Sequence, residues 1–312
     1  MPRDHSCPIR PVLDALDRDI LQGKEKALRL SFIALLAGGH ILLEDLPGLG
    51  KTTLALALAG VLGLSFGRVQ CTSDLLPSDI TGLSVYDRDT GNFRFVPGPI
   101  FSHILLIDEI NRAMPKTQSA MLEAMEERRV TVEGTGHPLP DPFLVIATQN
   151  PAEQVGTFPL PESQLDRFLL VTDIGYPPQD LEKDIIRNGG IHHRIRELEP
   201  LLDGEALLTA RRAVRRIHLG ERLVDYIYQL VAATRDHPCL VCGLSTRGAL
   251  NLAYAARAAA YLDDRDFVLP EDIQQLAIPV GAHRLMLRAE REALSKTEVL
   301  QSILDSVPVP RV

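Results

Sequence analysis

A glycine-containing loop that ends in a lysine and a threonine gives the strongest chemical signal in the sequence. It reads Asp45-Leu-Pro-Gly-Leu-Gly-Lys-Thr52 and lies between an apolar run at residues 40–43 and an Ala/Leu-rich run at residues 54–62. A glycine-rich loop between a strand and a helix turns its backbone N–H groups towards phosphate oxygens, and the helix dipole adds favourable positive charge. The loop therefore predicts a nucleotide site in which Lys51 contacts the β- and γ-phosphates and the Thr52 hydroxyl binds Mg²⁺.

The rest of this loop is expected to surround the phosphates, apart from its first residue. The residues predicted to line the phosphates beside Lys51 and Thr52 are Pro47, Gly48, Leu49, Gly50 and Thr53. Asp45 stands where the usual pattern has its first glycine, and a carboxylate near a triphosphate would repel it. We therefore expect Asp45 to point away from the phosphates or to cap the loop. The alternative for the whole motif is a Gly/Pro turn followed by an unrelated Lys-Thr pair.

Two adjacent carboxylates follow another apolar run. Residues 104–107 are Ile-Leu-Leu-Ile, and Asp108 and Glu109 come directly after them. In an open α/β sheet the carboxyl ends of the strands face the ligand crevice, so both acids are expected beside the phosphate loop. An Asp there can hold the magnesium shell, and the following Glu can polarise water as a general base. Alone, such a pair could also cap the end of a strand.

A third apolar run delivers a polar amide to the same predicted edge. Residues 143–148 read as a strand, and Asn150 follows shortly after it. The amide of Asn150 offers both a donor and an acceptor, so it could bind the attacking water or the γ-phosphate. An Asn before a proline, here Pro151, is usually a turn residue. Only its neighbours favour a catalytic role.

The elements that must position these residues divide the chain into two parts. Five short apolar runs, at residues 40–43, 67–71, 104–107, 143–148 and 168–172, alternate with helical patterns. Strands separated by helices predict an α/β fold with a parallel sheet. After Tyr176-Pro-Pro178, every periodic stretch is helical, and these stretches are residues 205–217, 221–235, 246–262 and 270–288. We predict an α/β nucleotide-binding domain over residues 1–176 and a smaller all-helical domain over 177–312.

The composition narrows the class of protein. The chain has 312 residues, a formal net charge of −8 and four cysteines. An acidic chain is poorly suited to gripping phosphate backbones, so nucleic acid is not expected as a partner. Four scattered cysteines and the lack of an apolar leader favour a reducing, cytoplasmic setting, and no run reaches the roughly 20 apolar residues of a transmembrane helix.

These motifs, in this order, resemble those of AAA+ ATPases, and the residues within and around them narrow the resemblance to the MoxR family. The phrases that carry it are Gly39-His-Ile-Leu-Leu-Glu-Asp-Leu-Pro-Gly-Leu-Gly-Lys-Thr-Thr53, Thr72-Ser-Asp-Leu-Leu-Pro-Ser-Asp-Ile-Thr-Gly82, Ile107-Asp-Glu-Ile-Asn-Arg-Ala113, Ala147-Thr-Gln-Asn-Pro151, Pro159-Leu-Pro-Glu-Ser-Gln-Leu-Asp-Arg-Phe168 and Gly243-Leu-Ser-Thr-Arg-Gly248. The resemblance runs from about residue 11 to about residue 290. It implies a AAA+ parallel-sheet P-loop domain followed by an α-helical lid.

The resemblance also implies a role for each motif. Lys51 and Thr52 belong to Walker A, Asp108 and Glu109 to Walker B, and Asn150 to the first sensor. Arg167 matches the arginine finger, which works on the neighbouring subunit's γ-phosphate, and Arg247 matches the sensor that ties the lid to nucleotide in its own subunit. A guanidinium presents a rigid fork to phosphate oxygens, which suits both roles.

Plainer interpretations exist for several of these residues. Arg167 could instead form a salt bridge with Asp166 or another acid, and Arg247 could lie on a helix surface without a role. The segment Gln22-Gly-Lys-Glu25 sits where relatives line the adenine pocket. Residues 79–99 and 129–137 read as hairpin-bearing inserts, which the resemblance makes substrate- or pore-facing and which could also be plain surface hairpins.

The resemblance implies an Mg²⁺-dependent ATP hydrolase that assembles as a ring, with a hexamer expected, and that remodels or matures a protein complex as a chaperone would. It also implies a protein client that carries a von Willebrand factor A domain. A nucleic-acid motor or loader is one alternative, which the net charge disfavours. The other is a nucleotide-switched scaffold with little turnover, which the presence of Glu109 disfavours.

Overall fold

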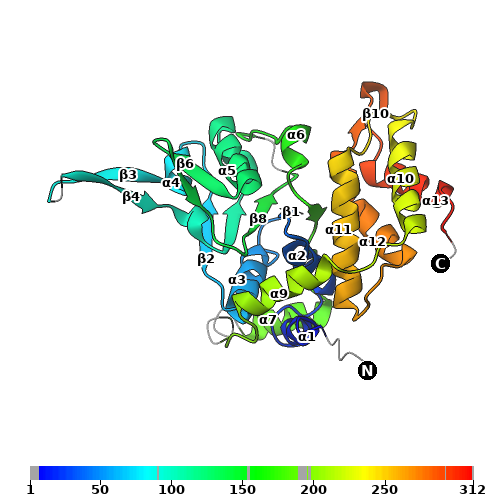
Figure 1. The fold of residues 1–312 in the computed structure, drawn as a ribbon, viewed down its shortest axis with the longest axis horizontal. Helices are drawn as coiled ribbons and strands as arrows, with labels where there is room; N and C mark the ends of the chain where they lie inside the picture. Colours follow the sequence, from blue (N-terminus) through cyan, green and yellow to red (C-terminus); the bar gives the residue numbers. More distant parts are fainter. Residues whose placement is uncertain are drawn as a thin grey trace.

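A five-stranded parallel sheet forms the centre of the first part of the chain (Figure 1). The computed structural model describes residues 7–89, 91–152, 155–188, 195, 198–291 and 293–310. The strands are β1 (Ile41–Glu44), β2 (Phe66–Gln70), β5 (Ile104–Asp108), β8 (Leu144–Gln149) and β9 (Leu170–Thr172), and their spatial order is β2-β5-β8-β1-β9. Each of these strands corresponds to one of the five predicted apolar runs. The predicted α/β parallel sheet is confirmed.

The apolar runs form strands because helices cover both faces of the sheet. Along β5 the side chains alternate between two cores: Ile104 and Leu106 face one, whereas Leu105 and Ile107 face the other. The first core includes helices α1 (Arg10–Asp19), α2 (Glu25–Ala37), α3 (Lys51–Val61) and α9 (Gly204–Val214) and continues into the helices of the last part of the chain. The second core includes helices α4 (Pro77–Thr81) and α5 (Pro115–Glu127). A short helix α6 (Glu162–Leu165) precedes β9, and α7 (Gln179–Asn188) follows it.

Both predicted inserts contain hairpins. One is formed by β3 (Gly82–Asp87) and β4 (Asn92–Pro97), and the other by β6 (Arg129–Val132) and β7 (Thr135–Pro138). The β3–β4 hairpin projects far from the body of the molecule (Figure 1). At its base the two strands approach closely, since a Cβ on Gly82 would lie 2.3 Å from the Val96 carbonyl oxygen.

The last part of the chain forms the helical lid. Its helices are α10 (Glu221–Arg235), α11 (Thr246–Leu262), α12 (Pro270–Gly281) and α13 (Lys296–Ser306). The predicted helical lid is confirmed, and its helices are accompanied by one short antiparallel ribbon of β10 (Leu240–Cys242) and β11 (Met286–Leu287). In the described residues, no helix is long and apolar enough to cross a membrane.

The helix predicted for residues 270–288 is too long. It ends at Gly281, where a 3₁₀ turn over Ala282–Arg284 begins. Leu300 of α13 packs so closely there that a Cβ on Gly281 would lie 2.9 Å from its side chain. After this turn the chain approaches the sheet, where Arg284 contacts the Leu169 carbonyl oxygen. Earlier in the chain, α9 packs against α2 within the first core. The domain division at residue 176 stays a prediction.

His40, directly before β1, is buried at the amino-terminal edge of the sheet. Its Nδ1 accepts a hydrogen bond from the Val145 N–H at 3.0 Å, and its Nε2 lies 3.3 Å from the Met125 carbonyl oxygen, which fits a neutral ring with the proton on Nε2. Burial, followed by the positive charge of Arg128, lowers the pKa of His40 to about 3. The neutral ring thus joins β8 to the end of α5.

This buried histidine predicts a loss of stability in mild acid. The unfolded chain binds a proton at His40 below about pH 6.5 whereas the folded chain does not, so the free energy of unfolding falls by about 1.4 kcal/mol per pH unit between 6.5 and about 3. Denaturant unfolding at pH 7 and pH 5 measures it, and this group accounts for about 2 kcal/mol of the difference. A His40→Gln variant should lose this part of the pH dependence, whereas His218→Gln, at an exposed position, should keep it. An unchanged pH dependence in His40→Gln would contradict the assignment.

Candidate nucleotide site

The loop between β1 and α3 has the backbone conformation that phosphate binding requires. Gly48 and Gly50 adopt positive φ angles of 85° and 99°, a region that residues with a Cβ rarely occupy. A Cβ on Gly48 would meet no atom within 4 Å, so the loop is open to a ligand at this point. Gly50 is the N-cap of α3, and because it has no side chain, none caps the first N–H groups of that helix. These N–H groups can therefore bind an anion.

Asp45 points away from this loop. Its Oδ2 accepts hydrogen bonds from the N–H groups of Ile174 and Gly175 at 2.8 and 2.7 Å, which lie after the end of β9. The carboxylate therefore joins the start of the loop to the segment that leads from the sheet into α7. This is the orientation expected of an acid that must not repel a triphosphate.

Lys51 reaches back across the loop. Its ammonium donates a hydrogen bond to the Asp45 carbonyl oxygen. Burial lowers the pKa of Lys51, and the negative charges of Asp45, Asp108 and Glu109 act in the opposite direction. The half-buried ammonium of Lys51 can exchange this carbonyl oxygen for phosphate oxygens. A phosphate compensates the positive charge better than a neutral carbonyl does.

The segment before α2 meets the same edge of the sheet. Lys24 is buried, and its ammonium donates to the carbonyl oxygens of Ile174 and Gly175. Gly23 has a positive φ of 70°, and a Cβ there would lie 2.5 Å from Cδ of Pro178. The segment predicted beside the adenine pocket therefore packs against the chain that leaves β9, next to the partners of Asp45.

Asp108 and Glu109 come together at the carboxyl end of β5, and residues from two neighbouring strands bind them. Asp108 Oδ2 lies 2.8 Å from Nε of Arg68, and its Oδ1 lies 3.5 Å from the hydroxyl of Thr148. The Thr148 hydroxyl also accepts a hydrogen bond from the Glu109 N–H at 2.9 Å. Thr148 therefore holds the backbone between the two acids.

The Glu109 side chain is turned towards β2. Its Oε2 accepts a hydrogen bond from Gln70 Nε2 at 2.9 Å and lies 3.2 Å from Nε of Arg112. Glu109 has a positive φ of 56°, which is uncommon for a residue with a side chain and typical of functional sites. The carboxylate is partly exposed, so it can leave Gln70 and reach a water molecule beside the phosphates.

Sequence reasoning missed Arg68, Gln70 and Thr148. The parallel register pairs Gln70 with Asp108 across β2 and β5, so these contacts require the strand order β2-β5-β8. Only a signal that fixed this order could have found them, because a polar residue at a strand end is otherwise unremarkable in a sequence.

Asn150 lies at the same edge but forms a turn. Its Oδ1 accepts a hydrogen bond from the Ala152 N–H at 3.1 Å, as an Asn before a proline commonly does. Among the described residues, Thr148 and not Asn150 contacts the acidic pair. The catalytic role of Asn150 stays a prediction.

The donors at this edge fit a nucleotide and its metal ion. The Thr52 hydroxyl and the Asp108 carboxylate are the oxygen ligands that Mg²⁺ prefers, and they end the loop and β5 at the same edge of the sheet. Asp108 is buried, and Arg68 and Thr148 orient its oxygens. Lys51 and the open N–H groups of the loop supply the positive charge that polyphosphate needs.

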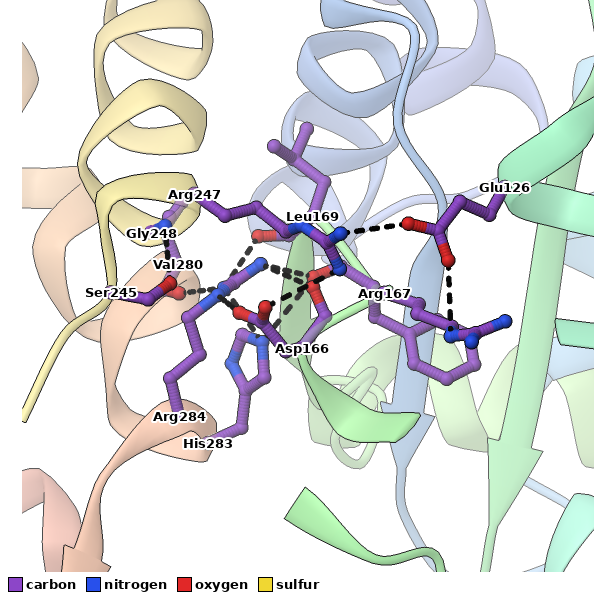
Figure 2. A network of polar contacts seen from close by, with 11 residues as sticks. Glu126, Asp166, Arg167, Leu169, Ser245, Arg247, Gly248, Val280, His283 and Arg284 are labelled. Carbon is purple, nitrogen blue, oxygen red and sulfur yellow. Dashed lines mark hydrogen bonds and ion pairs between the residues drawn. The ribbon is translucent and has the colours of Figure 1, made fainter. Parts of the chain in front are cut away.

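Both predicted arginines bind the same glutamate, Glu126, in the last turn of α5. Figure 2 shows the two guanidinium groups on either side of its carboxylate. Nε of Arg167 lies 3.4 Å from Glu126 Oε2, and a terminal nitrogen of Arg247 lies 2.7 Å from Glu126 Oε1. The second terminal nitrogen of Arg247 lies 3.5 Å from Asp166. Arg167, in the loop before β9, and Arg247, in α11, therefore belong to one cluster of charged side chains.

A buried arginine that sequence reasoning missed holds this cluster together. The guanidinium of Arg284 is 2 % exposed and pairs with Asp166 at 2.7 Å. It also donates to the carbonyl oxygens of Phe168, Leu169 and Val280, so its donors are well satisfied (Figure 2). Arg284 thereby fixes the lid to the loop that carries Arg167.

This cluster lies at the opposite edge of the sheet from the nucleotide loop. Arg167 precedes β9, and the Leu169 N–H donates to the carbonyl oxygen of His40, which precedes β1. The nucleotide loop follows β1 and the acids follow β5, and these strands are all parallel. The strands of the sheet have three to six residues and span about 10–20 Å, so the two groups are separated by the length of a strand.

The placement of Arg247 differs from the expectation for it. The resemblance implied that Arg247 contacts nucleotide in its own subunit, but its contacts lie with Arg167 at the amino-terminal edge. The reason is that Arg284 and Asp166 fix the start of α11 and the end of α12 to the loop before β9. The lid therefore presents Arg247 beside Arg167.

Comparison with known proteins agrees with this geometry. Residues 40–170 match the ATPase family associated with various cellular activities (AAA), and residues 232–303 match the AAA lid domain. The chain is 47% identical to YeaC of Bacillus subtilis (strain 168), over 93% of this chain and 92% of that protein. It is 38% identical to chaperone MoxR1 of Mycobacterium tuberculosis, over 94% of this chain and 80% of that protein.

A solved structure is similar over nearly the whole chain. It is the crystal structure of a putative ATPase from Cytophaga hutchinsonii, which is 38% identical and superposes with a TM-score of 0.90 over 97% of this chain and 95% of that one. The family match covers the parallel sheet from β1 to the start of β9, and the lid match covers most of the helices in the last part of the chain. The chain belongs to the MoxR family of AAA ATPases.

Proposed function

We propose that this ATPase binds and hydrolyses ATP at the junction between two copies of the chain, which are arranged in a ring with six subunits expected. The observation that carries the proposal is the separation of the two halves of the site. The phosphate loop and the acidic pair lie at one edge of the sheet, and Arg167 lies at the other. A heterologous contact that brings one edge of a subunit to the opposite edge of the next forms a ring when the rotation between subunits closes.

In this arrangement one subunit supplies the base and its neighbour supplies the positive charge. Glu109 leaves Gln70 and accepts a proton from water, while Lys51 neutralises the β- and γ-phosphates. Mg²⁺, which Thr52 and Asp108 would hold when it is bound, supplies further charge neutralisation at the phosphates. Arg167 of the neighbour stabilises the charge that develops on the γ-phosphate.

We further propose that Arg247 acts on the same neighbouring site. Its guanidinium shares Glu126 with that of Arg167, so a nucleotide close enough for one is within reach of the other. Since Arg284 joins the lid to the loop of Arg167, both arginines would move as one unit. This would convert the nucleotide state of one subunit into a lid position in the next.

The client is proposed to be a protein. The β3–β4 hairpin exposes apolar side chains along both strands, and these are Leu83, Val85, Tyr86, Phe93 and Val96. An exposed apolar ribbon suits unfolded or partly opened protein segments better than a polyanion. The chain's net charge of −8 points in the same direction. One relative carries the name chaperone, which fits this proposal. A client with a von Willebrand factor A domain is expected from the family.

The experiment measures phosphate release and client capture on the same protein. Purified chain should release phosphate from ATP with Mg²⁺ and should stop when EDTA is added, and Lys51→Ala should be inactive in both conditions. For the client, the Glu109→Gln chain held in ATP should retain a protein that the same chain in ADP releases. The choice of client would be overturned if the wild-type chain bound DNA tightly and in a salt-sensitive way and if no protein were retained in ATP and released in ADP.

A further inference from the structure

We infer that Glu126 is a positioning residue for ATP hydrolysis, which sets the two arginines that a subunit presents to its neighbour. The inference rests on the proposed function, in which one subunit supplies arginines to the nucleotide site of its neighbour; this shared site is called the trans site. It assigns a role to a glutamate outside every motif that the sequence analysis singled out. Glu126 contacts neither the phosphate loop nor the acidic pair, and its two oxygens bind one arginine each (Figure 2).

Glu126 stands on a rigid part of the fold. The residue before it, Met125, is buried, and its carbonyl oxygen bonds to the buried ring of His40. Two residues after it, the Arg128 guanidinium donates to the carbonyl oxygens of Phe143 and Gly38. The backbone on both sides of Glu126 is thus fixed to the amino-terminal edge of the sheet. A side chain with such support can hold a partner in one geometry.

The two arginines use this glutamate differently. The closest approach of Arg167 to it is through Nε, at 3.4 Å (Figure 2). Arg247 meets it through one terminal nitrogen and meets Asp166 through the other. Glu126 therefore lies beside Nε of Arg167, and together with Asp166 it holds Arg247 between two carboxylates.

Electrostatics explains why a carboxylate is needed at this place. Arg167, Arg247 and Arg284 bring three positive charges together, whereas Glu126 and Asp166 bring two negative charges. Asp166 already pairs with the buried Arg284. Without Glu126, Arg167 and Arg247 would repel each other and separate into solvent, since like charges at close range disfavour a shared geometry.

The test compares Glu126→Gln with Glu123→Gln, an exposed glutamate one turn earlier on the same helix. Gln keeps the shape of the side chain and removes its charge. We expect Glu126→Gln to lower kcat about tenfold with little change in the KM for ATP, because the arginines act on the transition state and not on ground-state binding. Glu123→Gln should match the wild-type chain.

Two further measurements separate a positioning role from a structural one. The effect of Glu126→Gln should disappear in a chain that already carries both Arg167→Ala and Arg247→Ala, since Glu126 acts through these two arginines. Mixed assemblies of Glu126→Gln with Lys51→Ala should regain activity, because Lys51→Ala chains supply intact arginines to intact phosphate loops. An unchanged kcat in Glu126→Gln, a further loss of activity when Glu126→Gln is added to the chain that lacks both arginines, or no recovery in the mixture would each overturn the inference.

The failure of this inference can be told apart from failure of the proposed trans site. The reference is the mixture of Arg167→Ala with Lys51→Ala. Should that mixture regain activity while Glu126→Gln behaves as wild type, the trans site stands and Glu126 has no positioning role. Should the Arg167→Ala mixture itself stay inactive, the trans site fails, and the inference about Glu126 fails with it.

Discussion

Replacing Glu109 by Gln is expected to lower the rate of ATP hydrolysis by about 10²–10⁴, the usual contribution of a general base, while ATP binding is retained. The side-chain amide of Gln cannot accept the proton from water, but the backbone N–H at position 109 keeps its hydrogen bond to the Thr148 hydroxyl. The phosphate loop and Asp108 are unchanged in this variant. Nucleotide affinity should therefore stay within a few-fold of wild type.

Single-turnover phosphate release and fluorescent-nucleotide titration measure these two quantities separately. Gln70 offers a matched control because it binds the same carboxylate without providing a base. Gln70→Ala should change the rate far less than Glu109→Gln does. Glu109→Gln that hydrolyses ATP at the wild-type rate would contradict the assignment of the base, and it would favour another route for activating water.

Replacing Arg167 by Ala is expected to lower kcat by about 10³–10⁵, the range found for arginine fingers supplied in trans. Its guanidinium lies at the edge of the sheet opposite the phosphate loop of its own chain, so nucleotide binding should be unaffected. Removal of this charge leaves Glu126 with Arg247 alone. The fold should be retained, because Arg167 is partly exposed and Arg284 makes the buried contacts of this loop.

Steady-state phosphate release and the affinity for ATP should be measured together on this variant. Arg18→Ala provides the control, since Arg18 is an exposed arginine on α1 that pairs with its neighbour Asp19. Arg18→Ala should behave as wild type in both measurements. Full ATPase activity in Arg167→Ala would show that Arg167 is not the finger.

The sequence predicted the sheet and the glycine conformations of the loop well, because local signals determine both. Five apolar runs became the five strands, and the loop at Asp45–Thr52 took the open conformation that its glycines require. Helices at residues 221–235 and 246–262 also begin and end as predicted. Apolar periodicity and glycine placement are properties of short segments, so they need no knowledge of the tertiary fold.

The arginine cluster could not be predicted, because it depends on contacts between distant segments. Glu126 lies 121 positions before Arg247, and Arg284 lies 118 positions after Asp166. No local pattern distinguishes Glu126 from Glu123 or Glu127 on the same helix. The turn after Gly281 replaced the end of a predicted helix, and that turn places Arg284 in the core. As a result, the side of the sheet on which Arg247 lies could be found only in the structure.

The central claim is that each active site is completed by a neighbouring chain, and mixing two inactive chains tests it most directly. Lys51→Ala has intact arginines but no functional phosphate loop, and Arg167→Ala has the reverse. The two variant chains are co-expressed with different tags, and the mixed assemblies are purified through both tags. In these assemblies about a quarter of the junctions should pair an intact loop with an intact arginine. The account predicts ATP hydrolysis at about that fraction of the wild-type rate. A mixed assembly no more active than either parent would contradict it.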